Sequence, residues 1–188
     1  AGPRSGLIIS ACGDEDIYKK LNSSVFPGNQ GGPLCHVIAA KAVAFGQALS
    51  PDFEDYGKRV IANAQALSNH LVELGYGIIS GGTDNHLMLI DLRAKDPELT
   101  GKVAEETLGK CHITINKNTV PFEERSPFVT SGIRLGTPAL TTRGFAEHHM
   151  ITVAELIDKA LVNRDNPSTL SEVAKSVEEL TEGMPLFA

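Results

Sequence analysis

The sequence predicts an α/β fold, in which helices cover a small sheet of three or four strands. The run HLMLIDL at residues 86–92 alternates between two sets of side chains, as expected for a strand with at least one buried face. Apolar residues also recur every three or four positions over residues 51–74, 142–162 and 168–180. Such stripes are typical of helices that lie on a sheet.

The first fifty residues are expected to contain a strand and two helices. Leu7-Ile8-Ile9 is a short apolar run after a turn, which is typical of a buried strand, and it is expected to complete a sheet whose other strands lie elsewhere. Residues 14–22 begin with acidic and end with basic side chains, an order that complements a helix dipole. A second helix is expected from Pro33, where apolar residues return at helical spacing. We place a domain boundary at its end, which gives domains 1–50 and 51–188.

A long helix is predicted to open the second domain. Ser50 is a favourable N-cap and Pro51 a favourable first helical residue, and Gly75 ends the apolar stripe. Two strand candidates follow at 76–80 and 86–92, joined by the turn GGTDN.

The remainder of the chain alternates between the two kinds of element. Thr100 is expected to cap a short helix through Lys110, and residues 111–115 alternate as a third strand. The segment 115–128 is polar and long for a connection, which is often a mark of a binding loop. Its pair Glu123-Glu124 is interpreted as solvated rather than as an acid/base dyad.

The stretch SPFVTSGIRLGTPALTTRG at 126–144 holds the most informative side chain. Arg134 stands between Ile133 and Leu135, and Thr137-Pro138 ends the strand, so its guanidinium is expected at the edge of a rigid element. A fork of donors that stays charged suits a planar carboxylate or a phosphate. A structural ion pair is the alternative for Arg134, and the role of Arg143 is left open.

The stretch FPGNQGGP at 26–33 indicates a possible anion site. Its adjacent glycines precede a predicted helix, where exposed backbone N–H groups commonly cradle phosphate. The spacing is neither that of a P-loop nor that of a dinucleotide fingerprint, so a plain connecting loop is the alternative.

Composition excludes several classes of function. The net charge of −6 argues against a nucleic-acid surface, and no apolar run is long enough to span a membrane, so a soluble cytoplasmic protein is expected. The three cysteines have no repeated spacing and predict neither disulfides nor zinc. No metal site is expected, because the side chains of adjacent residues diverge in each of the pairs Cys35-His36, Cys111-His112 and His148-His149.

Four segments together resemble one enzyme family. GPRSGLII, FPGNQGGPLCHVIAAKAVAF, SGGTDNHLMLIDL and SPFVTSGIRLGTPALTTRG closely resemble serine hydroxymethyltransferase, which exchanges serine and glycine with tetrahydrofolate and uses pyridoxal 5'-phosphate (PLP). The resemblance covers nearly the whole chain. It implies a fold-type I PLP-dependent transferase, with residues 1–50 as the C-terminal part of the large PLP-binding domain and 51–188 as the small domain. It also implies a cytoplasmic homodimer, or a tetramer, that shares active sites across the interface.

The resemblance also implies roles for particular residues. Arg134 corresponds to the arginine that binds the α-carboxylate of serine or glycine. Gly31 and Gly32 correspond to glycines that reach the PLP phosphate of the neighbouring subunit. Arg4 would sit near the cofactor lysine, and a surface or ion-pair arginine is the alternative for it. The residues that correspond to folate contacts are Asn118, Ser126, Pro127, Phe128 and Phe26. For Asn118 and Asn116, an ordinary place in a turn is the alternative.

The catalytic lysine is not expected in this chain. In the family the Schiff-base lysine lies just ahead of the GPR segment, so it would precede Ala1, and the chain alone should be inactive. It reads as the C-terminal portion of a longer protein, with apolar surface exposed on residues 1–50 if these do not associate. Two other interpretations stay open: another fold-type I PLP enzyme, such as an aminotransferase or decarboxylase, or a binding module without catalysis. The INKN and SPF segments favour the folate enzyme.

Overall fold

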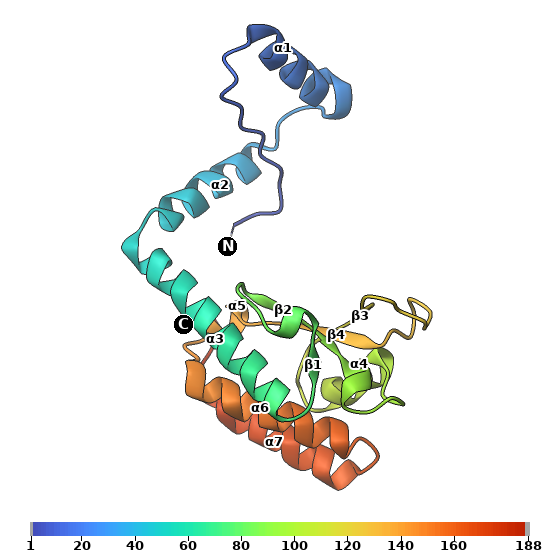
Figure 1. The fold of residues 1–188 in the computed structure, drawn as a ribbon. Helices are drawn as coiled ribbons and strands as arrows, with labels where there is room; N and C mark the ends of the chain where they lie inside the picture. Colours follow the sequence, from blue (N-terminus) through green and yellow to red (C-terminus); the bar gives the residue numbers. More distant parts are fainter. Residues whose placement is uncertain (1, 187–188) are drawn as a thin grey trace. The chain divides into compact units, whose positions relative to one another are not determined.

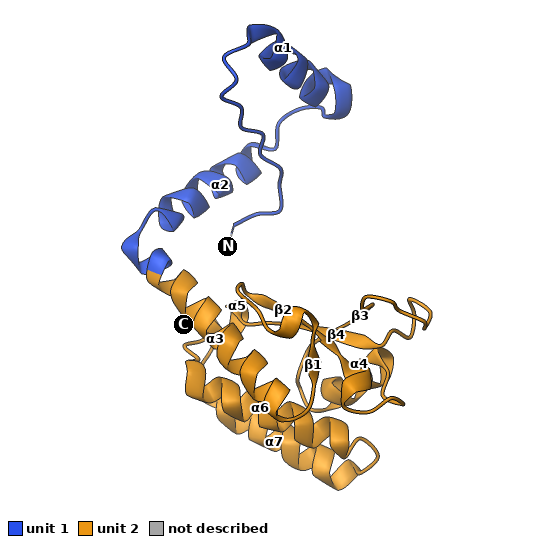
Figure 2. Cartoon of the chain, viewed as in Figure 1, with its two compact units in different colours: residues 1–54 blue, residues 55–188 orange. Residues whose placement is uncertain are grey.

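The computed structural model describes residues 2–186 and contains two compact units. Unit 1 comprises residues 1–54 and unit 2 residues 55–188 (Figures 1 and 2). The boundary falls inside helix α3 (Pro51–Glu73), close to the predicted boundary at residue 50. The assignment of the first unit to a larger PLP-binding domain stays a prediction.

Unit 1 is built from helices and extended backbone. Helix α1 (Glu15–Ser23) begins where the charge pattern predicts, because the Asp14 carboxylate accepts the N–H groups of Asp16 and Ile17. An irregular segment, η1 (Ser24–Asn29), follows, in which Phe26 has extended backbone angles (φ −136°, ψ 126°). Helix α2 (Cys35–Ala48) comes next.

The strand predicted at 7–9 does not form within residues 2–186, which contain no other strand of its expected sheet. These residues adopt no strand, and Leu7, Ile8 and Ile9 are 60%, 62% and 82% exposed. A strand needs a neighbour for its backbone N–H and C=O groups, and the described part of the chain offers none at this segment.

Unit 1 has no core of its own. None of residues 2–54 is buried. The expected exposure of apolar surface on this part of the chain is confirmed, and the large exposed side chains are Leu7, Ile8, Ile9, Ile17, Val25, Phe26, Leu34, Ile38, Val43, Phe45 and Leu49.

Unit 2 is organised around a four-stranded antiparallel sheet, which agrees with the three or four strands predicted from the sequence. The strands are β1 (Gly77–Ile78), β2 (Leu87–Asp91), β3 (Asn116–Asn118) and β4 (Gly132–Gly136), in the order β1-β2-β4-β3. Strand β4 is therefore an inner strand between β2 and β3. In register across it, Arg134 is paired with Leu89 on one side and with Asn116 on the other.

The predicted third strand at 111–115 is wrong, because the C-cap of the preceding helix falls inside it. Helix α4 (Gly101–Lys110) begins as predicted, with the Thr100 hydroxyl accepting the N–H of Val103. Cys111 caps the helix and is fully buried, and His112 has a φ of 61°, a left-handed conformation that cannot extend a strand. The strand forms only from Asn116 onward.

Helices cover one face of the sheet, as Figure 1 shows for unit 2. Besides α3 and α4 these are α5 (Pro138–Thr142), α6 (Glu147–Val162) and α7 (Pro167–Glu182). Two 3-10 turns, η2 (Ile79–Gly81) and η3 (Leu92–Ala94), flank β2. The core contains Met88, Ile90, Ile133 and Leu135 from the sheet, packed with apolar side chains of α3, α4, α6 and α7. On the opposite face Leu87 and Arg134 are exposed, so that face is open.

Candidate functional site

The open face of the sheet presents Arg134 near its middle. Its neighbours along β4, Ile133 and Leu135, are 0% and 7% exposed and point into the core, so alternation turns Arg134 outward. Arg134 lies in the middle of an inner strand rather than at the edge of an element. Within residues 2–186 it makes no hydrogen bond or ion pair, so the alternative of a structural ion pair is not observed in this chain.

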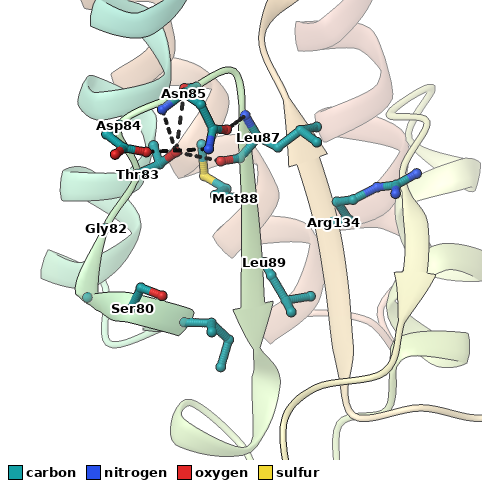
Figure 3. Close-up of a pocket in the computed structure, with 11 residues that line it drawn as sticks. Ser80, Gly82, Thr83, Asp84, Asn85, Leu87, Met88, Leu89 and Arg134 are labelled. Carbon is teal, nitrogen blue, oxygen red and sulfur yellow. Dashed lines mark hydrogen bonds between the residues drawn. The ribbon is translucent and has the colours of Figure 1, made fainter. Parts of the chain in front are cut away.

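A hollow of about 670 Å³ lies beside Arg134, over the turn between β1 and β2. Thr83 organises the turn: its hydroxyl donates to the carbonyl of Leu87 (2.6 Å) and accepts the N–H of Asn85 (3.2 Å). The side-chain amide oxygen of Asn85 (Oδ1) in turn accepts the N–H of Leu87 (2.8 Å). Figure 3 shows this cluster on one side of β2 and the Arg134 side chain projecting from β4, away from the cluster. The guanidinium is therefore exposed and points away from this turn.

Strand β3 adds two asparagines to the face of Arg134. Asn116 is its cross-strand partner, and Asn118, two residues along, lies opposite Gly132. Between them Lys117 faces the other way, where its Nζ and backbone N–H contact the Glu105 carboxylate on α4 (3.1 and 3.2 Å). The Asn118 amide donates to the carbonyl of Thr119 (2.7 Å), which leaves its oxygen available. The structure thus brings Asn118 and Arg134 to one face.

The loop 119–131 carries Ser126, Pro127 and Phe128 and is held by the carboxylate of Glu123. That carboxylate accepts four hydrogen bonds: from the N–H groups of Val120 (3.4 Å), Arg125 (3.0 Å) and Ser131 (2.7 Å), and from the Ser131 hydroxyl (2.7 Å). Burial alone raises the pKa of Glu123, but these donors outweigh it and lower the pKa to about 2. The interpretation of Glu123 as a solvated side chain is therefore wrong.

Arg125 fastens the same loop to the segment before α4. Its guanidinium donates to the carbonyls of Leu99 (3.0 Å) and Pro97 (2.5 Å). Phe122 and Phe128 nevertheless stand 94% and 83% exposed. A loop with a fixed backbone thus presents two aromatic rings to its surroundings.

The sequence offers only an indirect signal for Glu123. A long connection between two strands must satisfy its own backbone N–H groups, and a carboxylate inside it is a natural acceptor. Which of the two adjacent glutamates turns inward depends on the loop backbone, which the residue pattern does not give. Glu124 is exposed.

In unit 1, the predicted cofactor residues and Phe26, which is predicted as a folate contact, line one hollow of about 530 Å³. Arg4, Phe26, Gly31 and Gly32 all border it. Within residues 2–186 the N–H groups of the two glycines make no hydrogen bond, and a Cβ added at either would meet no atom within 4 Å. Helix α2 begins only at Cys35, so the glycines precede it rather than open it. This arrangement can accept an anion through two free N–H groups and a nearby guanidinium.

Arg143 has a structural role in unit 2. Its Nε donates to the carbonyl of Met184 (2.6 Å) and its Nη2 to that of Thr181 (3.2 Å), so it binds the C-terminal end of α7. It also borders a second hollow together with Arg134.

Among the described residues no group of three or more His, Cys, Asp or Glu side chains could hold a metal ion. Nor is any helix in residues 2–186 both long and apolar enough to cross a membrane.

Comparison with known proteins decides the family. The family model described as serine hydroxymethyltransferase matches residues 1–157. The chain belongs to the serine hydroxymethyltransferase family. The matched range includes all the predicted site residues described above. The match also confirms the assignment of the chain to the α/β, fold-type I class.

Curated relatives agree. The chain is 58% identical over 187 residues to a serine hydroxymethyltransferase of Alteromonas mediterranea and 57% identical over 188 residues to that of Pseudoalteromonas atlantica. A serine hydroxymethyltransferase of Shewanella sediminis is 54% identical over 187 residues. Each comparison covers 100% of this chain and 44% of the relative, so the chain spans less than half the length of these relatives.

Proposed function

We propose that the full-length protein interconverts serine and glycine with tetrahydrofolate and 5,10-methylenetetrahydrofolate, using PLP, as a homodimer in the cytoplasm. One observation carries the proposal. Arg134, a residue inside the family match, is exposed on the open face of the sheet and has no acidic partner within residues 2–186. An unpaired guanidinium fixed on a rigid strand is suited to hold a carboxylate in two parallel hydrogen bonds.

Arg134 would act by orienting the substrate. Two hydrogen bonds from one planar guanidinium fix both the position and the plane of the α-carboxylate of serine or glycine. With the carboxylate held in place, rotation about the bond between Cα and the amino nitrogen is restricted, and this would determine which Cα bond is presented for cleavage. PLP, when bound, supplies the electron sink for the charge that develops at Cα.

The glycines of unit 1 would hold the phosphate of the cofactor. The free N–H groups of Gly31 and Gly32 fit a dianion, and Arg4 in the same hollow adds positive charge. By the family resemblance, this phosphate belongs to the cofactor of a neighbouring subunit. The lack of buried residues in unit 1 supports such an assembly, because its apolar side chains would be covered there.

Unit 2 would contribute the folate contacts. The free amide oxygen of Asn118 fits a donor on the edge of a pterin ring. Ser126, Pro127 and the exposed ring of Phe128 would border the folate, and Phe26 of unit 1 is proposed for the same pocket from across the interface.

The test is an assay of the full-length protein with PLP, serine and tetrahydrofolate. We expect glycine to form in amounts equal to the one-carbon unit transferred, and only when tetrahydrofolate is present. Transfer of the amino group to a keto acid would indicate an aminotransferase, and release of carbon dioxide a decarboxylase. Binding of serine without turnover would indicate a module without catalysis. Each of these three results would overturn the proposal.

A further inference from the structure

The inference concerns the loop 119–131 and rests on the proposed function. Three of the proposed folate residues, Ser126 to Phe128, lie in this loop, and Asn118 lies just before it. The loop contains no helix or strand. Backbone hydrogen bonds hold part of its second half, from the N–H groups of Val129 and Thr130 to the carbonyl of Ser126, and the rest of its shape depends on hydrogen bonds that side chains make to its backbone.

Glu123 supplies most of those hydrogen bonds. Its Oε1 accepts the Arg125 N–H and the Ser131 hydroxyl, and its Oε2 accepts the N–H groups of Val120 and Ser131. Val120 follows β3 and Ser131 precedes β4, so one carboxylate joins the two ends of the loop. Ser131 is 1% exposed, which places this junction in the body of unit 2.

From this geometry we propose that Glu123 is a positioning residue for tetrahydrofolate: it closes the loop so that Asn118 and the segment 126–128 are held in a fixed relation. It acts through the backbone of the loop and is not itself a catalytic residue. A fixed loop binds a ligand more tightly than a mobile one, because less conformational entropy is lost on binding. Arg134 lies on β4, beyond the closed loop, where it is paired with Leu89 on β2 and Asn116 on β3 and makes no contact with the carboxylate.

The chain offers a matched set of variants for the test. Glu123→Gln keeps the size of the side chain but leaves only one of its two oxygens as an acceptor. Glu124→Gln is the control, since this neighbour is exposed and within residues 2–186 makes no hydrogen bond. Ser131→Ala removes the hydroxyl donor and leaves the three backbone donors in place.

The measurements are the KM values for tetrahydrofolate and serine in the full-length enzyme, with equilibrium binding of tetrahydrofolate as a second readout. For Glu123→Gln we expect the KM and Kd for tetrahydrofolate to rise about tenfold, which corresponds to about 1.4 kcal/mol, while the serine KM stays unchanged. Ser131→Ala should show a smaller rise in the same direction, and Glu124→Gln none.

The possible negative results separate an error in the inference about Glu123 from an error in the proposed function. If the wild type uses both substrates and Glu123→Gln keeps the wild-type KM for tetrahydrofolate, the inference is overturned and the proposed function stands. A parallel loss of serine and tetrahydrofolate affinity also overturns it, because the residue would then be merely structural. Should Glu123→Gln not fold, Ser131→Ala decides, and an unchanged tetrahydrofolate KM in that variant counts against the inference. If the wild type binds serine and never tetrahydrofolate, the proposed function falls as well.

Discussion

Arg134 owes its exposure to alternation along β4. With Ile133 and Leu135 in the core, the residue between them must point to the opposite face of the sheet. The sequence therefore predicts that Arg134 and its two neighbours face opposite ways. It does not predict that the face of Arg134 lacks a helical cover, because this depends on where helices that are distant in the sequence pack.

Glu123 was missed for a related reason. A carboxylate that accepts several backbone N–H groups depends on the fold of a whole loop, while residue patterns report only the neighbours in sequence. Asn118 and the segment 126–128 could be proposed from the resemblance alone. What holds them in place could be seen only in the structure.

At the residue scale, we predict how Glu123 contributes to stability as a function of pH. Its pKa in the folded protein is about 2, below the value of about 4.3 in an unfolded chain. A lowered folded pKa means that the contribution is complete above the unfolded value and is lost as pH falls toward the folded one. The free energy of unfolding of wild type should therefore exceed that of Glu123→Gln clearly at pH 7 and by much less near pH 3.

Urea titrations of both proteins at the two pH values measure this difference. The other carboxyl groups with lowered pKa values, Asp91, Asp96 and Glu105, are present in both proteins and cancel in the comparison. If the free energies of unfolding of the two proteins differ by the same amount at pH 7 and pH 3, the hydrogen bonds at Glu123 do not favour its charged form.

At the scale of elements, the helices were predicted more accurately than the strands. Asp14 and Thr100 cap helices at the predicted starts, because a capping side chain acts on N–H groups only two or three residues ahead. The strand at 111–115 was predicted wrongly, and the strand expected at 7–9 has no partner strand within residues 2–186. An alternating or apolar run shows that a segment suits a strand, but whether a strand forms depends on a partner elsewhere in the chain.

Arg143 provides a prediction at this scale. It binds the carbonyls of Thr181 and Met184 at the end of α7 through two guanidinium nitrogens, which a lysine cannot reproduce. We expect Arg143→Lys to lower the stability of unit 2 by about 1 kcal/mol and to leave the serine KM unchanged. Thermal unfolding of the full-length protein, together with serine kinetics, checks both parts. A raised serine KM at unchanged Tm would instead place Arg143 in the substrate site.

For the whole molecule, the two units differ in their ability to fold alone. The apolar core lies in unit 2, whereas no residue in 2–54 is buried. Burial of apolar surface is the main driving force for folding, so a part of the chain without a core depends on other contacts. The sequence indicated this difference only through the family resemblance, since the apolar content of residues 1–50 looks like that of an ordinary domain.

We predict that residues 50–188 fold as an independent domain, with Ser50 retained because its hydroxyl accepts the N–H of Phe53 at the start of α3. Circular dichroism should show cooperative thermal unfolding for this fragment and none for residues 1–49. The 188-residue chain should bind a dye for apolar surfaces more strongly than the fragment does. Equal dye binding, or a fragment that does not unfold cooperatively, would contradict the prediction that unit 2 folds alone and unit 1 does not.

The most direct test of the account is the serine KM of the Arg134→Lys variant in the full-length enzyme, with Arg143→Lys as the matched control. Loss of the paired hydrogen bonds should raise the KM by about one and a half to four decades, while PLP binding, followed by its absorbance, stays intact. The control should keep the wild-type KM. A serine KM that is unchanged in Arg134→Lys would contradict the assignment of this guanidinium to the substrate carboxylate.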